Sequence, residues 1–191
     1  MGDVLMVDAE SGDMTLQGSL RIKNVDNIHH IRVTNFMQVA RIHDYLKAHC
    51  KHRDANDEEA LYRLQAKVTG RTVDQLKEAG PAPRYKTVIV DSLTEVDVYC
   101  TYGILNLDVD KVLRGDTGDL DVAGWPEFRK NNEMIKLLVR AYRDLPLNVI
   151  FTCAEQWTQD ETKKFHYTPA LTGKLSGQVQ GFVDIVGYLV T

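Results

Sequence analysis

Acidic and amide side chains follow three apolar stretches of the sequence, and they are the first candidates for chemistry. Glu10 follows the run VLMVD, Asp91 ends the run YKTVIVD, and the pair Glu155 and Gln156 follows the run NVIFTC. Such runs predict buried strands, and in open α/β sheets ligands bind outside the carboxyl ends of parallel strands. Carboxylates there can hold a hydrated Mg²⁺ ion and orient water, while an amide can contact a terminal phosphate. The set therefore suits a magnesium–nucleotide site.

The elements that must position these residues alternate along the chain. Short apolar runs predict strands at 3–8, 31–33, 85–91, 148–153 and 183–190. Helical spacing predicts helices over 35–49, 57–67, 72–79, 94–106 and 126–143. Residues 107–124 and 154–181 are polar and are interpreted as loop insertions. The alternation predicts the α/β class, with a mostly parallel sheet flanked by helices.

Composition sets the general class of the protein. The chain has 191 residues, is 43% hydrophobic and 26% charged, and carries a net charge of −4. These values suit one domain over 1–191 and argue against a surface that binds nucleic acid everywhere, although a local basic patch remains compatible with them. Three cysteines without a C-x-x-C motif indicate reduced thiols in a cytoplasmic protein. No apolar run approaches the roughly 20 residues that span a bilayer, so we expect no membrane contact.

The three strand motifs together resemble a known family. VLMVDAESGD is similar to the second core strand of RecA-like ATPases, YKTVIVDSLTEV to their Walker B strand, and NVIFTCAEQ to the strand that follows. The later segment PALTGKLSGQVQGFVDIVGYLV resembles the closing segment of phage-encoded RecA-like nucleotide-binding proteins, whose relatives include recombination proteins. The resemblance covers most of the chain and keeps the order and spacing of the motifs.

The resemblance implies a function and a set of roles. It implies an ATPase of phage DNA recombination or replication, which uses ATP and Mg²⁺ and forms rings or filaments of identical subunits. Glu10 would polarise the attacking water, and Asp91, followed by Ser92, would hold the metal through water. Gln156 would sense the terminal phosphate. Glu95, in the first turn after Asp91, is an alternative water-orienting acid, although a carboxylate there also suits the positive end of a helix.

The phosphate loop of this family is the main departure. The sequence contains no G-x-x-x-x-G-K-[ST] motif, and TGKLSG has Leu175 where a hydroxyl is needed. The family places its phosphate loop just upstream of the strand with which this sequence opens. We therefore expect a RecA-like core without its first β-α unit, either as a fragment or through loss of the loop. Such a chain should hydrolyse ATP poorly on its own.

A second candidate site lies in the segment 157–175. Lys163 and Lys164 can contact phosphates, and Phe165 and Tyr167 can stack on unpaired bases, as in the mobile DNA-binding loop of RecA-like recombinases. The simpler interpretation is a flexible surface loop. Lys174 could instead reach the nucleotide of a neighbouring subunit. Trp125 and Trp157 are interpreted as packing anchors.

Two further predictions follow from these assignments. The rival function is a non-catalytic module with the same fold, kept for binding DNA or forming oligomers. The RecA-like interpretation also requires strand 85–91 to lie between 3–8 and 148–153, all parallel. We expect the outer edge of 148–153 to be covered by the terminal strand 183–190, by another chain or by further residues.

Overall fold

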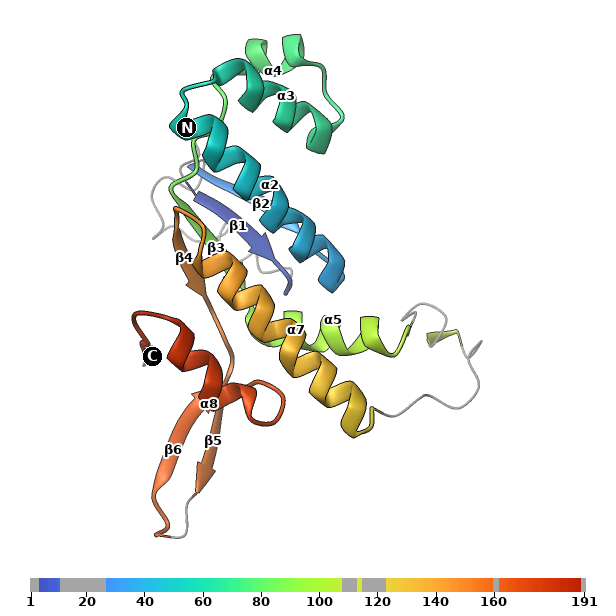
Figure 1. Cartoon of the computed structure of the whole chain (residues 1–191), viewed down its shortest axis with the longest axis vertical. Helices are drawn as coiled ribbons and strands as arrows, with labels where there is room; N and C mark the ends of the chain where they lie inside the picture. Colours follow the sequence, from blue (N-terminus) through green and yellow to red (C-terminus); the bar gives the residue numbers. More distant parts are fainter. Residues whose placement is uncertain (1–3, 11–26, 108–112, 115–122, 160–161, 190–191) are drawn as a thin grey trace.

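A four-stranded parallel sheet forms the centre of the protein, as seen in a computed structural model that describes residues 4–10, 27–107, 113–114, 123–159 and 162–189 (Figure 1). The strands are β1 (Val4–Asp8), β2 (Ile28–Arg32), β3 (Thr87–Asp91) and β4 (Asn148–Phe151). Their order is β2-β1-β3-β4, and all neighbouring pairs are parallel. The α/β class and the central position of 85–91 are therefore confirmed.

Three long helices cover one face of this sheet. They are α2 (Phe36–Asp54), α5 (Leu93–Ile104) and α7 (Trp125–Arg143). Side chains alternate along a strand, so Leu5 and Val7 of β1 share a face with Val88 and Val90 of β3. These four valine and leucine side chains are fully buried in one apolar cluster with residues of all three helices. The apolar stripe of each helix thus fixes which face of the sheet it covers.

A smaller helical unit follows α2. It consists of α3 (Glu58–Thr69) and α4 (Val73–Ala79), which share a separate apolar cluster that includes Leu61 and Leu76. Thr72 begins α4 through a capping box with Gln75, and Gly70 ends α3 in the left-handed conformation that glycine adopts at low cost. Both helices agree with the sequence-based prediction within two residues. Figure 1 shows this unit at the end of the molecule opposite the β5–β6 hairpin described next.

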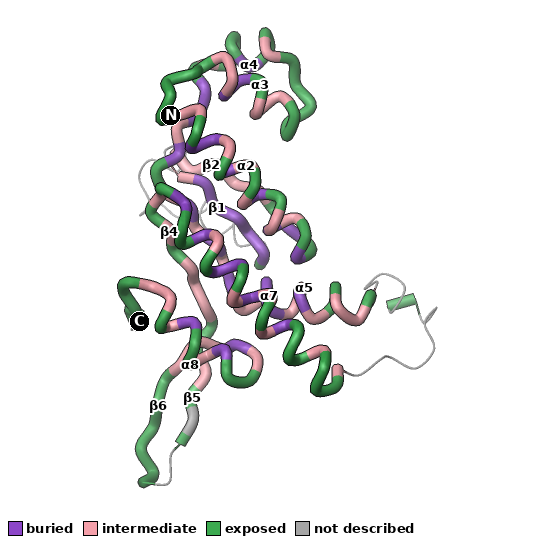
Figure 2. The backbone as a smooth tube through the Cα atoms, viewed as in Figure 1, coloured by how far each residue is buried: buried purple, intermediate pink, exposed green. Residues whose placement is uncertain are grey.

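The prediction that the polar segment 154–181 is a loop is wrong. It contains an antiparallel hairpin, β5 (Glu155–Gln159) and β6 (Phe165–Pro169), followed by α8 (Leu175–Val179) and the short helix η2 (Gln180–Phe182). The β-branched and aromatic residues in EQWTQ and FHYTP are the signal that could have predicted two strands. Figure 2 shows that most of the hairpin is exposed, in contrast to the mostly buried strand β1.

The prediction of a terminal strand over 183–190 is also wrong, since the described residues 183–189 form no strand. Ile185 is 85% exposed and Leu189 is 93% exposed. The tail instead approaches the hairpin, where the rings of Tyr188 and Tyr167 lie 5.3 Å apart. A strand needs a neighbouring edge for its backbone hydrogen bonds, and the tail does not pair with β4. Coverage of the β4 edge by other residues or another chain stays a prediction.

The described helices also bear on the expectation of no membrane contact. Within the ranges given above, none combines the length and the apolar character needed to cross a bilayer. The predicted loop 107–124 lies mostly outside the described residues.

Candidate functional site

The carboxyl ends of β1 and β3 bring two of the predicted site segments together. Asp8 and Asp91 lie opposite each other in the parallel register, and the Ala9 amide donates to the Asp91 carbonyl at 2.7 Å. Neighbouring strands are about 4.8 Å apart, so the residues that follow Asp8 and Asp91 share one edge of the sheet. The structure therefore joins the segments of Glu10 and Asp91 at the edge where α/β sheets bind ligands.

Ser92 links the two segments through its side chain. Its hydroxyl donates a hydrogen bond to Oε1 of Glu10 and accepts one from the Glu95 amide at 3.3 Å, which makes Ser92 the N-cap of α5. The Glu10 amide donates to Oδ1 of Asp8 at 3.1 Å. The Asp91–Ser92 peptide bond is cis. Glu10 is thus held beside Ser92, and the Glu95 backbone serves as part of the helix cap.

Asp91 has a partner that sequence reasoning missed. The hydroxyl of Thr152 donates to Oδ1 of Asp91. The Thr152 amide donates to the Val90 carbonyl at 3.1 Å, and its carbonyl accepts from the Leu93 amide at 2.8 Å. Thr152 extends the pairing of β3 and β4 past the last residue of β4 and orients the Asp91 carboxylate. A threonine at the end of the apolar run NVIFTC was the available signal.

Gln156 lies on β5, outside this cluster. Its side-chain amide donates to the Pro169 carbonyl at 3.0 Å and so closes the base of the hairpin. Glu155 accepts a hydrogen bond from the Tyr188 hydroxyl. Within the described ranges no hydrogen bond joins Gln156 to Glu10 or Asp91, so its role as a phosphate sensor stays a prediction.

The side-chain oxygen atoms at this edge of the sheet are suitable ligands for a hard metal cation. Carboxylates of Asp8, Glu10 and Asp91 and hydroxyls of Ser92 and Thr152 supply oxygen only, and oxygen ligands are those that Mg²⁺ prefers. No group of three or more histidine, cysteine or acidic side chains able to hold a metal by itself occurs among the described residues. The residues present therefore fit an ion that is held by one or two carboxylates and completed by water and phosphate, as Mg²⁺ usually is.

A comparison with protein-family models decides the family of this chain. The model described as an AAA domain matches residues 1–191. The chain belongs to the AAA domain family. AAA domains are in general nucleotide-dependent ATPases of the P-loop type that use a metal ion, and the parallel sheet of this chain agrees with that fold. A search of curated proteins found no match.

The β5–β6 hairpin of this AAA domain carries the predicted DNA-binding residues. Trp157 lies opposite Tyr167 in the antiparallel register, and the Trp157 and Phe165 rings meet edge to face at 5.2 Å. The three rings are 61%, 57% and 52% exposed for Trp157, Tyr167 and Phe165. Lys163 and Lys164 lie between the strands, and the Lys163 carbonyl accepts from Gln159 at 3.1 Å. The structure thus places all four predicted residues on one projecting element.

Both tryptophans correct the sequence interpretation. Trp157 was expected to anchor the core, but it forms an aromatic row with Phe165 and Tyr167 on one face of the hairpin. Trp125 begins α7 and is 89% exposed. Sequence reasoning missed Trp157 as a surface residue because a large apolar side chain is buried more often than not. The alternation of EQWTQ, once recognised as a strand, places Trp157 and Glu155 on the same face.

A buried carboxylate connects the AAA domain core to the segment after the hairpin. Asp97 of α5 is 3% exposed and accepts three hydrogen bonds. Asn131 of α7 donates at 2.6 Å, while the Thr172 amide and hydroxyl donate at 2.7 and 2.6 Å. Burial without partners would be costly for this carboxylate, so the three donors are what allow it to lie in the core. Asp97 thereby fixes Thr172, two residues before Lys174, which is exposed at the start of α8.

Two cysteines near Asp97, Cys100 and Cys153, have raised pKa values. Burial, with a smaller contribution from the charge of Asp97, raises the pKa of Cys100 to about 12 and that of Cys153 to about 11. All three cysteines are free thiols, in agreement with the sequence-based expectation. Low reactivity at neutral pH follows, because the thiolate is the nucleophilic form.

Proposed function

We propose that this AAA domain binds Mg²⁺–ATP at the edge formed by Glu10, Asp91 and Ser92, and that it acts on single-stranded DNA. The resemblance of its strand motifs supports a role in phage DNA recombination or replication, in the host-cell cytoplasm. The observation that carries the proposal is the hydrogen bond from Ser92 to Glu10 beside Asp91, at the carboxyl ends of neighbouring parallel strands. No sequence motif alone requires these two segments to meet.

The chemistry assigns one task to each side chain. Asp91, oriented by Thr152, would hold the hydrated Mg²⁺ ion, which when bound polarises the phosphate oxygens. Glu10 would accept a hydrogen bond from the attacking water and orient it, as Ser92 shows it can accept one. Gln156 would contact the terminal phosphate only after leaving its partner Pro169.

Nucleotide affinity tests the proposal directly. Binding of a fluorescent ATP analogue, measured by anisotropy, should be tighter with Mg²⁺ than with EDTA. Asp91→Asn should remove this difference in affinity. The control Asp44→Asn, which changes an exposed carboxylate on α2, should preserve it. Equal affinity with and without Mg²⁺ in the wild-type chain would refute the assignment.

Contact with single-stranded DNA is proposed for the hairpin face that carries Trp157, Phe165 and Tyr167. Aromatic faces stack on unpaired bases, and each stacked base contributes about 1–3 kcal/mol. Lys163 and Lys164 add phosphate contacts that make binding depend on salt.

Replacing both hairpin lysines with alanine should weaken binding of a labelled oligothymidylate and reduce the slope of log affinity against log salt by about 2. The matched control replaces Lys47 and Lys67, which are exposed on α2 and α3. Unchanged affinity and slope in the hairpin variant would remove the hairpin from the DNA site.

The rival, a non-catalytic module, is favoured by one observation. The sequence holds no G-x-x-x-x-G-K-[ST] motif, whose backbone amides and lysine would cradle the phosphates. DNA binding by the hairpin with no measurable nucleotide affinity would support this rival over the ATPase.

Assembly into a ring or filament is proposed as well, with Lys174 acting on the nucleotide of a neighbouring subunit. Its support is the exposed position of Lys174 beside the segment that Asp97 holds in place. Light scattering with Mg²⁺–ATP and DNA should show oligomers, and Lys174→Ala should lower nucleotide affinity without changing their size. A monomer under all conditions would contradict both statements.

A further inference from the structure

Two histidines and two tyrosines pack together near the amino ends of the strands, away from the edge that carries Asp91. This histidine–tyrosine cluster consists of His29 on β2, Tyr45 and His49 on α2, and Tyr85 in the segment before β3. Parallel strands begin at one edge of the sheet and end at the other, so the cluster is separate from the candidate nucleotide site. The proposed function uses none of these four side chains.

Tyr85 is the central member of the cluster. Its ring meets the His29 ring edge to face at 5.6 Å and lies 4.8 Å from the His49 ring. Its hydroxyl lies 2.8 Å from Nδ1 of His29 and shares a hydrogen bond with the Tyr45 hydroxyl. Through Tyr85 the cluster joins β2 to α2, although β2 and β3 are not neighbours in the sheet.

His49 is buried with only one of its ring nitrogens paired. The residue is 1% exposed, and Nε2 donates to the Pro83 carbonyl at 2.9 Å, whereas Nδ1 has no hydrogen-bond partner among the described residues. A carbonyl only accepts, so Nε2 carries the proton of the neutral ring and Nδ1 carries its lone pair. A second proton, on Nδ1, would create a cation with a buried N–H donor that has no acceptor.

The surroundings of His49 oppose this second proton. Burial is the largest effect and lowers the pKa of His49, and the hydrogen bond to the Pro83 carbonyl only partly offsets it. The charges of Arg53 and Arg84 lower the pKa further, while the carboxylate of Asp54 raises it. His49 is therefore neutral at pH 7 and gains a proton less readily than a histidine in water.

Burial also lowers the pKa of His29, and the charge of a protonated His30 beside it acts in the same direction. A cavity of about 540 Å³ borders His29 and is lined by residues 28–31, Tyr45, Tyr85 and part of α3. None of these described lining residues is a carboxylate, so the cavity offers a His29 cation no opposite charge. Protons can reach the cluster through water in this cavity, but the protonated ring is not stabilised there.

We propose that the histidine–tyrosine cluster is a pH-sensitive contact, which holds β2 and the segment 82–85 against α2 at neutral pH and opens locally when His29 and His49 take up protons. In the open form each histidine is hydrated and has a pKa of about 6.5, which is above its value in the closed contact. The open form therefore binds more protons, and acid favours it. The contact keeps its full stability above about pH 6.5 and loses it as the pH falls below that value.

Hydrogen exchange of the intact chain at pH 7.5 and 5.5, read by mass spectrometry and corrected for the intrinsic exchange rate, tests the proposal. Amides of β2 and of residues 45–54 in α2 should exchange up to about ten-fold faster at pH 5.5 for each histidine that the closed contact keeps neutral, because pH 5.5 is about one unit below the pKa of a hydrated histidine. Amides of α7, which carries no member of the cluster, should show no such increase.

Two substitutions remove the titrating groups and keep their hydrogen bonds. His29→Asn offers the Tyr85 hydroxyl a carboxamide near the place of Nδ1, and His49→Gln offers the Pro83 carbonyl an amide donor near the place of Nε2. The matched control is His166→Gln, at an exposed histidine on β6. The double variant His29→Asn with His49→Gln should lose most of the pH effect, while His166→Gln should behave as the wild type does. Circular dichroism confirms that each variant is folded.

Three results would overturn the proposal. The first, which needs no variant to fold, is equal exchange of β2 at the two pH values in the wild type. The second is an equal increase in β2 and α7, which would show general unfolding instead of a local opening. The third is an undiminished pH effect in the folded double variant, which would assign the effect to other groups.

Discussion

Replacing Asp97 with alanine should be among the most destabilising single changes in this AAA domain. Asp97 accepts three hydrogen bonds in the core, one from Asn131 and two from Thr172. Each hydrogen bond to a charged group contributes about 1.5–3 kcal/mol, which gives an upper range of about 4.5–9 kcal/mol for independent bonds. The three bonds share one carboxylate and are not additive. We therefore expect a loss of about 3–5 kcal/mol in the free energy of unfolding, comparable to breaking a buried ion pair.

Urea unfolding followed by far-ultraviolet circular dichroism measures this loss. Thr172→Val removes only the hydroxyl donor and should cost about 1–2 kcal/mol. Asp44→Ala is the control, because the Asp44 side chain is 81% exposed and its loss should change stability by less than about 0.5 kcal/mol. Asp97→Ala stability within about 1 kcal/mol of the wild type would show that the carboxylate does not hold the segment after the hairpin to α5 and α7.

Three further outcomes are expected. Phosphate release from ATP should stay near background in the wild-type chain and in Asp91→Ala, since the sequence lacks the phosphate-loop motif. Robust turnover by the wild-type chain that is abolished in Asp91→Ala would contradict this expectation. Trp157→Ala should weaken oligothymidylate binding about ten-fold with little change in stability, whereas Trp125→Ala, which changes an even more exposed tryptophan, should leave binding intact. Equal effects of the two changes would remove the aromatic row from the DNA site. The rate of alkylation of Cys153 and Cys100 should be slow at pH 8, because their raised pKa values of about 11 and about 12 keep both side chains as thiols. The rate should increase as the pH approaches these values. Fast labelling of both cysteines in the folded chain at pH 8 would contradict this expectation.

Local pattern predicted much of the sheet and the helices. The runs at 3–8, 85–91 and 148–153 are β-branched and apolar, and all three form strands. β1 and β3 lie in the centre of the sheet, whereas β4, predicted to be buried, is an edge strand on which Ile150 is 47% exposed. The strand order was also correct, since the resemblance to RecA-like proteins carries the topology along with the motifs. Apolar spacing predicted the helices, although α2 extends to Asp54, five residues past its predicted end at 49. In the structure Thr72 and Ser92 cap the starts of α4 and α5, and such caps act within a few residues of the chain.

The predictions for two segments were wrong because the structure of each segment depends on which other part of the chain it pairs with. The hairpin at 155–169 is exposed, so it lacks the apolar run by which a buried strand is recognised, and its aromatic residues face outward. The tail at 183–189 has the composition of a strand, but composition does not supply an edge to pair with. In the structure the tail contacts the hairpin through Tyr188 rather than β4.

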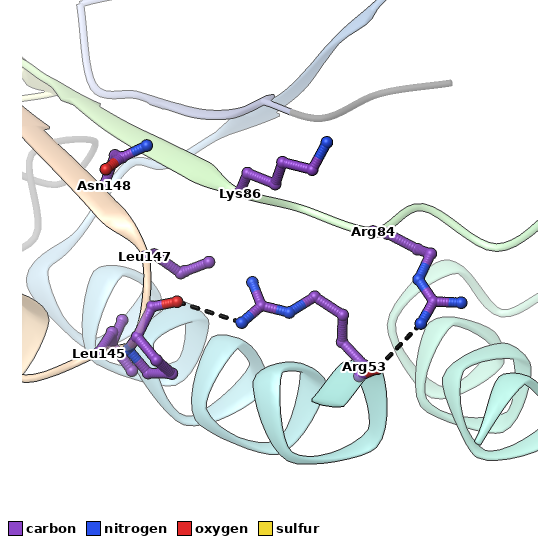
Figure 3. A pocket seen from close by; sticks show the side chains of 7 residues that line it. Arg53, Arg84, Lys86, Leu145, Leu147 and Asn148 are labelled. Atoms are coloured by element: carbon purple, nitrogen blue, oxygen red, sulfur yellow. Dashed lines mark hydrogen bonds between the residues drawn. The ribbon is translucent and has the colours of Figure 1, made fainter. Parts of the chain in front are cut away.

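The sequence by itself determined which residues could carry chemistry: acids and hydroxyls at the ends of apolar runs, and lysines beside aromatic residues. Only the tertiary structure decided which of them meet. Ser92 contacts Glu10 across 82 residues of chain, and Asp97 contacts Thr172 across 75. Hydrogen bonds act over about 3 Å, whereas sequence patterns report only neighbours within a strand or a few helical turns. For the same reason the sequence did not predict the cavity lined by Arg53, Lys86 and Asn148 (Figure 3). The pairing of β3 with β4 and the packing of α2 against the sheet bring these three segments together.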